Sequence, residues 1–149
     1  MQENVEVFVE VCREGVQIPA YAREGDAGMD VRAAETVVIE PGKTVLVPTG
    51  LKVAIPEGYE IQVRPRSGLS LKTSLRIANA PGTIDAGYRD EVCIIVQNVS
   101  HESQAVVEKG DRVAQFVLQR VPKIQFKQVP SVKDIGTDRG GGFGSTGVG

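Results

Sequence analysis

The stretch 81–91, PGTIDAGYRDE, combines a carboxylate, an aromatic ring and a turn sequence. Short runs of strand-forming residues flank Ala86-Gly87, and a glycine at the second position of a two-residue loop can take the positive φ that a tight hairpin needs. The pattern predicts a β-hairpin in which Asp85 and Tyr88 lie opposite each other on one face. Such a pair can hold a sugar, with the ring under its apolar face and the carboxylate beside a hydroxyl or a water. An ordinary surface hairpin has the same composition, because Asp and Gly favour turns for backbone reasons.

A second candidate site is the stretch 64–68, RPRSG, which places two guanidinium groups before a hydroxyl. The one segment that looks helical, 67–72, starts there, and Ser67 can serve as its N-cap. A helix N-terminus offers free N–H groups and partial positive charge, so the stretch predicts an anion site. A pair of solvated arginines near a helix start is the alternative interpretation.

The glycine-rich segment 138–149 contains GFGSTG, a formal match to G-x-G-x-x-G. No predicted strand precedes it and too few residues follow for a helix, so we reject a dinucleotide-binding motif. Its N–H groups and hydroxyls, together with Arg139 and Phe143, could fold over a ligand and contact its phosphates. A disordered tail has the same composition, and both interpretations stay open at this point.

Two further polar residues stand beside apolar segments. Gln115 interrupts the apolar run 113–118, and Asn79 precedes Ala80-Pro81. Each is expected either to serve a polar site or to satisfy a structural hydrogen bond.

The elements that must position these residues are short strands separated by Pro/Gly turns. Many short strands with one short helix predict an all-β, jelly-roll-like barrel or sandwich. We expect one β domain over 1–137 and a flexible C-terminal arm over 138–149. Besides the hairpin, strands are predicted at 5–12, 27–34, 36–39, 44–47, 51–55, 59–63, 75–79, 92–96, 105–108, 112–118 and 123–129.

Composition excludes several classes of function. The chain has 149 residues, 41% of them hydrophobic and only 5% aromatic, so a single core of Val, Ile and Leu is expected. A net charge of −2 argues against sequence-independent nucleic-acid binding. Cys12, Cys93 and the lone His101 lack zinc-site spacing. No run is apolar enough for a signal peptide or a membrane span, which predicts a cytoplasmic protein without membrane contact.

Taken in order, these segments resemble the trimeric dUTPase family, the deoxyuridine triphosphate nucleotidohydrolases. The resemblance covers five separated segments, which makes it specific: 27–34, 64–70, 79–91, 110–117 and 139–147. It implies hydrolysis of dUTP to dUMP and pyrophosphate by in-line attack of water on the α-phosphorus, with Mg²⁺ bound to the triphosphate. It further implies a homotrimer with shared active sites, and a role in limiting uracil incorporation into DNA and supplying dUMP for dTMP synthesis.

The resemblance assigns roles to the residues of the predicted hairpin. Asp85 matches the family's catalytic aspartate, which orients and deprotonates the attacking water. Tyr88 matches the sugar-stacking residue, whose ring would crowd a ribose 2′-hydroxyl and reject UTP. Asn79 and the backbone from Thr83 to Cys93, including Ile84, correspond to the uracil pocket, where a narrow slot would exclude thymine and cytosine.

The remaining family positions concern phosphate and closure. Arg66, Ser67 and Gly68 match the phosphate-binding turn, and Gln115 matches a residue that places phosphate or water. Asp30 matches an aspartate for which we expect structural support rather than contact with metal-bound water, so no direct metal ligand is implied. The closing arm, which covers a neighbour's site in the family, is matched by Arg139, Phe143, Ser145 and Thr146.

Two departures and two alternatives remain. Asp90 stands where the family often has glycine, and Phe116 where it often has a smaller aliphatic residue. A dCTP deaminase shares the fold but places a catalytic glutamate in the strand after the hairpin, where 92–96 is wholly apolar here. A non-catalytic nucleotide-sensing protein on the same scaffold is the alternative from a different class.

Overall fold

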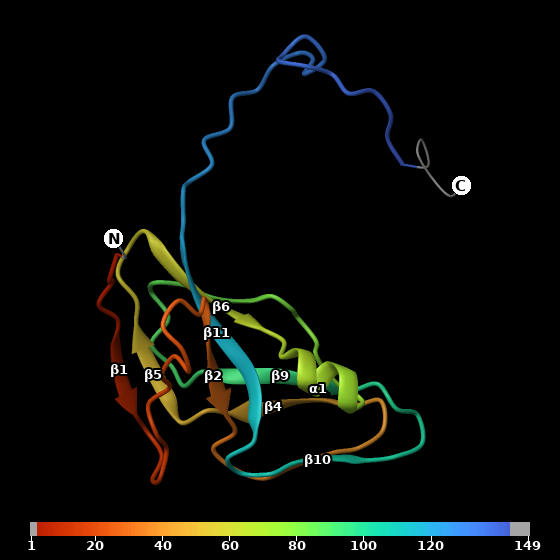
Figure 1. Ribbon diagram of the computed structural model, residues 1–149. Helices are drawn as coiled ribbons and strands as arrows, with labels where there is room; N and C mark the ends of the chain where they lie inside the picture. The colour runs from red at the N-terminus through yellow and green to blue at the C-terminus, as the bar shows by residue number, and fades with distance from the viewer. Residues whose placement is uncertain (1–2, 144–149) are drawn as a thin grey trace.

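The computed structural model describes residues 3–143 as a mostly antiparallel β structure with one short helix (Figure 1). The elements are β1 (Phe8–Val11), β2 (Gly28–Arg32), β3 (Val37–Ile39), β4 (Thr44–Pro48), β5 (Leu51–Ala54), β6 (Tyr59–Arg64), α1 (Ser67–Lys72), β7 (Leu75–Ile77), β8 (Gly82–Ile84), β9 (Cys93–Asn98), β10 (Ala105–Val107) and β11 (Arg112–Arg120). The predicted all-β, jelly-roll-like class is therefore confirmed.

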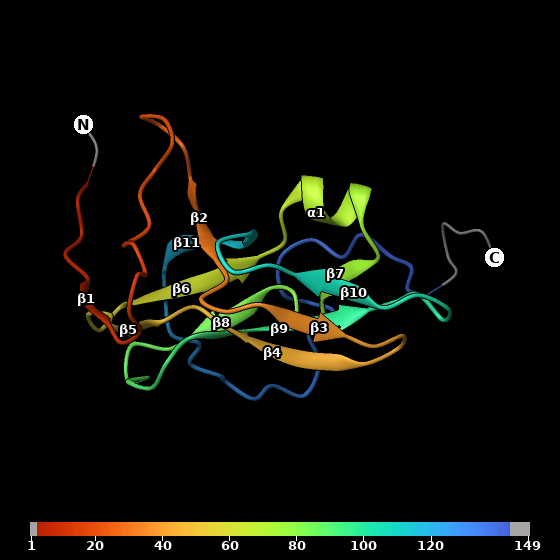
Figure 2. The same ribbon diagram turned by 90° about the horizontal axis from the view of Figure 1, so that it is seen from below.

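Two larger sheets organise the molecule. One has the strand order β2-β11-β6-β8 and the other the order β4-β9-β7, while β1 pairs with β5 and β10 with β3. Neighbouring strands run antiparallel throughout the described chain. Figure 2 shows α1 standing out from the strands beside β7, the strand that follows it. The helix is therefore an exposed projection, and none of its residues is fully buried.

The core lies between the sheets and consists mainly of Val, Ile and Leu side chains, as the composition predicts. Alternation is clearest in β9, where Ile94, Val96 and Asn98 point inward and the residues between them are half-buried. The one polar member of this row, Asn98, donates to the carbonyls of Ile39 and Ser103 at 3.0 and 2.9 Å. Because its amide is satisfied, it stabilises the packing instead of weakening it.

The predicted hairpin over 81–91 is wrong. β8 pairs with β6, and the next strand, β9, pairs with β4 and β7 in the other sheet. A tight turn does form, because the N–H of Tyr88 donates to the carbonyl of Asp85 at 3.1 Å. Gly87 is not among the glycines with positive φ, so the turn does not use the geometry that the sequence suggested. The segment between β8 and β9 therefore connects one sheet to the other. Which strands pair with β8 and β9 is decided by tertiary packing and not by the local sequence.

The chain beyond β11 leaves the sheets and extends away from them (Figure 1). The strand predicted at 123–129 is absent: no strand occurs between 121 and 143. Ile124 and Phe126 lie in solvent, 76% and 89% exposed, because no strand among residues 3–143 lies beside this segment. The predicted boundary between 137 and 138 stays a prediction.

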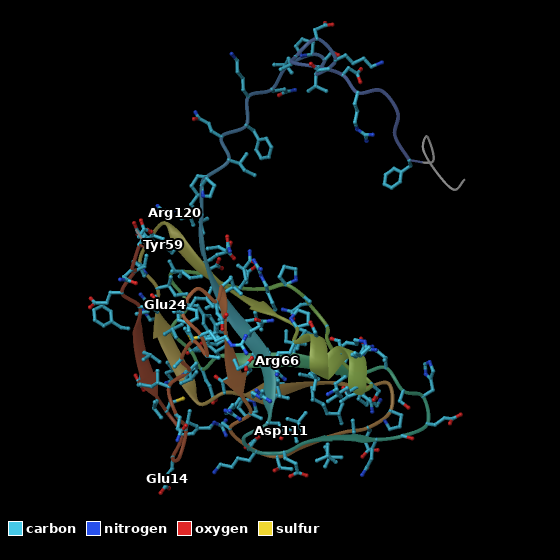
Figure 3. The ribbon with its side chains drawn as sticks, in the orientation of Figure 1. Glu14, Glu24, Tyr59, Arg66, Asp111 and Arg120 are labelled. Carbon is cyan, nitrogen blue, oxygen red and sulfur yellow. The ribbon has the colours of Figure 1, made fainter. Side chains whose placement is uncertain are left out.

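The point where this extension begins is fastened to the first residues of the chain. Arg120, the last residue of β11, forms an ion pair with Glu3 and lies 5.6 Å from the ring centroid of Tyr59. The Tyr59 hydroxyl donates to Glu3 at 3.0 Å, and Figure 3 shows Tyr59 and Arg120 together below the extension. Within residues 3–143 no helix is long and apolar enough to cross a membrane.

Candidate functional site

A cavity of about 200 Å³ lies where β6, β8 and β9 meet. Five residues singled out by sequence line it: Asn79, Thr83, Ile84, Tyr88 and Cys93. Its remaining lining is apolar and includes the first residue of β8, Gly82, and the β6 residue opposite it, Val63. The space is smaller than the roughly 300–1,000 Å³ of pockets for drug-sized ligands, which favours one small ring system.

The close approach of β8 to its surroundings depends on glycine at position 82. A Cβ atom on Gly82 would lie 3.2 Å from Nδ2 of Asn79 and 3.2 Å from Cβ of Val63. Any larger residue would therefore push the Asn79 amide away from the cavity. β8 is also the last strand of its sheet, so the backbone groups on its outer edge have no strand partner in the part of the chain that the structure describes.

Tyr88 is held by hydrogen bonds at both ends of its turn. Its hydroxyl donates to the carbonyl of Glu91 at 2.8 Å. The guanidinium of Arg89 donates to the carbonyls of Ala86 and Tyr88 at 2.6 and 3.0 Å. Burial, and then the nearby carboxylate of Asp90, raise the pKa of Tyr88, so its phenol stays neutral at physiological pH.

Asp85 begins this turn and is exposed. Its backbone carbonyl accepts from Tyr88, and within the described residues its carboxylate has neither a hydrogen bond nor an ion pair. The carboxylate is therefore available to a ligand or a water. Cys93 differs, because burial and then the charge of Glu91 raise its thiol pKa. A neutral thiol makes a wall of the cavity rather than a nucleophile.

A second group of predicted residues gathers around Asp30 on β2. Arg66 donates from Nε to Oδ1 of Asp30 at 3.0 Å, and Nη1 of Arg112 lies 3.6 Å from Oδ2. Arg66 also donates to the backbone carbonyl of Arg112 at 3.3 Å. Both oxygens of Asp30 therefore face guanidinium groups, and the arrangement holds Arg66 where Figure 3 labels it, beside α1.

Ser67 and Gly68 start α1, but Ser67 is not its N-cap. The N-cap is Arg66, which has extended backbone angles and makes no capping bond with its side chain. The prediction of a serine cap is thus wrong by one residue, since Ser67 already has helical geometry. Its hydroxyl is left exposed rather than used by the helix, and the first turn contains no acidic residue.

Gln115 lies on β11 opposite Asp30 on β2 and Arg64 on β6. Its amide donates to the carbonyl of Pro65 at 3.1 Å. A Cβ atom on Gly28 would lie only 2.4 Å from Oε1 of Gln115, so this glycine is required for the amide to occupy its place. Glycine at position 28 is therefore explained by the close approach of a side chain from the neighbouring strand.

The cavity beside Tyr88 and the group of residues around Asp30 lie apart within one chain. Val63 faces Gly82 and Ile61 faces Ile84, so β8 runs toward the beginning of β6 while Arg66 follows the end of β6. At about 3.3 Å per residue, Asp85 and Arg66 are separated by roughly 15–20 Å along the strand direction. The cavity beside Tyr88 accordingly has no lining from Arg66, Ser67 or Gln115.

Of the four predicted closing residues, the two within the described chain lie away from both groups. Arg139 and Phe143 lie in the extension beyond β11, and Phe143 is fully exposed. Ser145 and Thr146 lie outside the described residues. Across residues 3–143, no three His, Cys, Asp or Glu side chains gather in a group able to hold a metal ion.

Sequence reasoning missed Arg13 and Arg112 as partners of Glu91 and Asp30. Arg13 and Glu91 are 78 positions apart, so no local pattern connects them. Arg112 is basic, follows a Gly-Asp turn and lies in the family-like segment 110–117, but none of these signals identifies Asp30 as its partner.

Comparison with known proteins shows which family the chain resembles. The family model described as dUTPase matches residues 14–147. A deoxyuridine 5'-triphosphate nucleotidohydrolase of Fusobacterium nucleatum is 51% identical over 145 residues, covering 95% of this chain and 97% of the relative. One from Clostridium tetani is 44% identical over 140 residues, covering 93% and 94%.

Solved structures give the same result. The dUTPase of Staphylococcus bacteriophage 80alpha with dUPNHPP superposes with a TM-score of 0.85 at 31% identity, covering 96% of this chain and 99% of that one. A mutant dUTPase from phage phi11 of S. aureus, studied for its coordination of a structural Mg(II) ion, has a TM-score of 0.78 at 30% identity, covering 85% and 97%.

Proposed function

This chain belongs to the dUTPase family, and on that premise we propose that it is an enzyme that hydrolyses dUTP to dUMP and pyrophosphate. The observation that carries the proposal is the small cavity lined by Tyr88 and Cys93, with the available carboxylate of Asp85 on the turn beside it. In the cell this activity would limit uracil incorporation into DNA and supply dUMP for dTMP synthesis.

The cavity suits a single pyrimidine base. As an edge strand of the described chain, β8 has backbone N–H and C=O groups with no strand partner, which can pair with uracil, and Asn79 adds an amide to the lining. Ile84, Cys93 and Gly82 keep the space narrow, which disfavours the methyl group of thymine. The ring of Tyr88 lines the same space and would lie under the deoxyribose.

Hydrolysis needs water aligned behind the α-phosphorus and charge stabilised on the departing pyrophosphate. Asp85 would orient and deprotonate the water. Arg66, Ser67, Gly68 and Gln115 would bind the phosphates, with Arg66 held ready by Asp30. Arg139, Ser145 and Thr146 would reach the γ-phosphate, and Phe143 would stack over the base.

Mg²⁺ fits this arrangement as a partner of the triphosphate. It prefers phosphate oxygens and waters to a cage of side chains, and it would neutralise phosphate charge when bound. Asp30 already faces Arg66 and Arg112, so its chemistry suits contact through water at most. The protein groups that would act beside the ion are therefore the phosphate-binding residues named above.

The separation of the two groups supports a homotrimer with shared sites. Asp85 and Arg66 of one chain lie on opposite ends of β6, so a single triphosphate is served best by Asp85 of one copy and Arg66 of another. The extension beyond Arg120 is long enough to reach a neighbour, because an extended chain covers about 3.3 Å per residue.

The test is release of pyrophosphate from dUTP, dCTP and UTP, each with and without Mg²⁺. Release from dUTP alone supports the proposal. Ammonia from dCTP would select the deaminase, which the apolar strand β9 disfavours. Binding of dUTP without turnover would select the nucleotide sensor and refute the enzyme.

A further inference from the structure

The carboxylate of Glu91 joins three segments that are far apart in the sequence. Arg13 binds it through two hydrogen bonds, Nε to Oε2 at 2.6 Å and Nη2 to Oε1 at 3.0 Å. The N–H of Gly50 donates to Oε2 at 2.9 Å. These contacts, Arg13 foremost, lower the pKa of Glu91, so the carboxylate is charged at neutral pH. A two-point contact of this kind fixes the orientation of the carboxylate as well as its position.

The backbone next to this carboxylate carries one wall of the nucleotide cavity. The carbonyl of Glu91 accepts the hydrogen bond of the Tyr88 phenol. The carbonyl of Val92 accepts from N and Oγ1 of Thr49 at 3.1 and 2.6 Å. Cys93 follows directly and lines the cavity together with Tyr88. A shift of Glu91 would therefore move the acceptor of Tyr88 and the adjoining wall together.

We propose that Arg13 and Glu91 are a positioning pair that holds Tyr88 and Cys93 against the cavity and thereby sets the preference for deoxyribonucleotides over ribonucleotides. The inference rests on the proposed function, because it assigns the pair to the selectivity of that same site. Neither residue contacts the nucleotide itself; both act through the tyrosine.

A second ion pair of Arg13, with Glu35, provides a control for the pair with Glu91. Arg13 also donates from Nη1 to Glu35 at 3.0 Å, but Glu35 is 54% exposed and lies outside the segment that holds Tyr88. Glu35→Gln therefore removes one negative charge facing the same guanidinium without loosening the wall of the cavity. It is the matched control for Glu91→Gln.

The experiment measures kcat and KM for dUTP and UTP with wild type, Glu91→Gln, Arg13→Lys and Glu35→Gln. We expect Glu91→Gln to raise KM for dUTP about tenfold with little change in kcat, and to reduce the dUTP preference in kcat/KM severalfold. Glu35→Gln should match wild type. Arg13→Lys should fall between them, because lysine keeps the charge but not the two-point contact.

A double-mutant cycle separates positioning from general stabilisation. If Glu91 acts through Tyr88, then Tyr88→Phe and Glu91→Gln together should change selectivity by less than the product of their separate effects. Unchanged selectivity in a folded Glu91→Gln protein that melts at a lower temperature would overturn the proposal, since the pair would then be structural only. Should Glu91→Gln fail to fold, Arg13→Lys decides the same question.

Failure of the proposed function is visible separately, in the wild type. Wild-type protein that releases no pyrophosphate from dUTP refutes the hydrolase. The positioning pair is then judged by calorimetric binding of dUMP and UMP. Loss of a dUMP preference in Glu91→Gln, with Glu35→Gln unaffected, would sustain it, and an identical preference in both variants would refute it.

Discussion

Single atoms decide how the phosphate-binding group is built. Gly28 leaves room for Oε1 of Gln115, and a Cβ there would also lie 3.3 Å from Cγ2 of Val117. Asp85 differs from Gln115, because its carboxylate has no hydrogen-bond or ion-pair partner within the described chain. At this scale the sequence singled out Asp85, Tyr88 and Gln115 as site residues, which stays a prediction, whereas their hydrogen-bond partners are set by contacts across the fold.

Replacing Asp85 with Asn should leave affinity for dUTP nearly unchanged and reduce kcat by about 100-fold or more, because the amide cannot accept the proton of the attacking water. Single-turnover kinetics together with calorimetric titration of a non-hydrolysable dUTP analogue measure the two quantities. Asp90→Asn is the matched control, since Asp90 is an exposed acid in the same segment. Equal losses of kcat in both variants would contradict the role of Asp85.

Gly28→Ala should displace the Gln115 amide from its hydrogen bond with Pro65 and lower the free energy of unfolding by about 1–3 kcal/mol. Activity should fall as well, because Gln115 is proposed to place phosphate or water. The control removes the main obstacle: in Gly28→Ala/Gln115→Ala only the 3.3 Å approach to Cγ2 of Val117 remains, so adding Gly28→Ala to Gln115→Ala should cost much less stability than adding it to wild type. Denaturant unfolding measures this, and additive losses would show that the clash is not the cause.

At the scale of elements, the sequence located most strands but not their neighbours. Alternation and Pro/Gly turns predicted β4, β5, β6, β9 and β11 to within a few residues. The helix was predicted at its full extent, since Ser67–Lys72 lies between Pro65 and the next strand. The hairpin failed because a turn sequence shows where a chain reverses, whereas the sheet that receives it depends on the packing of β8 against β6.

The contact between Arg13 and Glu91 gives a pH-dependent stability. Because Glu91 has a lower pKa in the folded protein than its ordinary value of 4.5, the unfolded chain binds the proton first as pH falls. The stabilisation from this contact is complete above that ordinary value and is lost as pH falls through the lowered pKa. Thermal melts of wild type and Glu91→Gln should therefore differ at pH 7 and converge in acid. A constant difference would contradict this assignment.

At the scale of the whole molecule, one chain holds the cavity beside Tyr88 and the group around Asp30 apart from each other. The family resemblance found in the sequence is confirmed by the match over residues 14–147, yet no pattern in one chain shows that Asp85 and Arg66 lie on opposite ends of β6. Fold class followed from composition and turn spacing. The assignment of groups to different copies required the strand register, and the trimer and cytoplasmic location stay predictions.

Mixing two inactive variants tests the shared site. Asp85→Asn lacks the water-binding carboxylate and Arg66→Ala lacks a phosphate-binding guanidinium, so co-expressed chains should form mixed assemblies in which some sites contain both wild-type groups. Pyrophosphate release from dUTP should then rise well above that of either variant alone. A mixture as inactive as its parents would place both groups of one site in a single chain.

Removal of residues 139–149 should lower kcat/KM for dUTP by about tenfold or more while leaving the melting temperature near that of wild type. The physical reason is that the described part of this segment makes no contribution to the core, as the full exposure of Phe143 shows. Phe143→Ala in the full-length chain is the finer version of the test. A truncated protein with wild-type kinetics would remove the arm from the site.

The extension after Arg120 has a consequence for how the protein must be handled at low concentration. It carries Ile124, Phe126, Val132 and Ile135 on an exposed backbone, a set of side chains that water solvates poorly. An isolated subunit would expose these apolar side chains and, with the proposed shared sites, would hold only part of each active site. Specific activity should accordingly drop on dilution as the subunits dissociate. Newly synthesised chains should aggregate most readily before they assemble with other subunits.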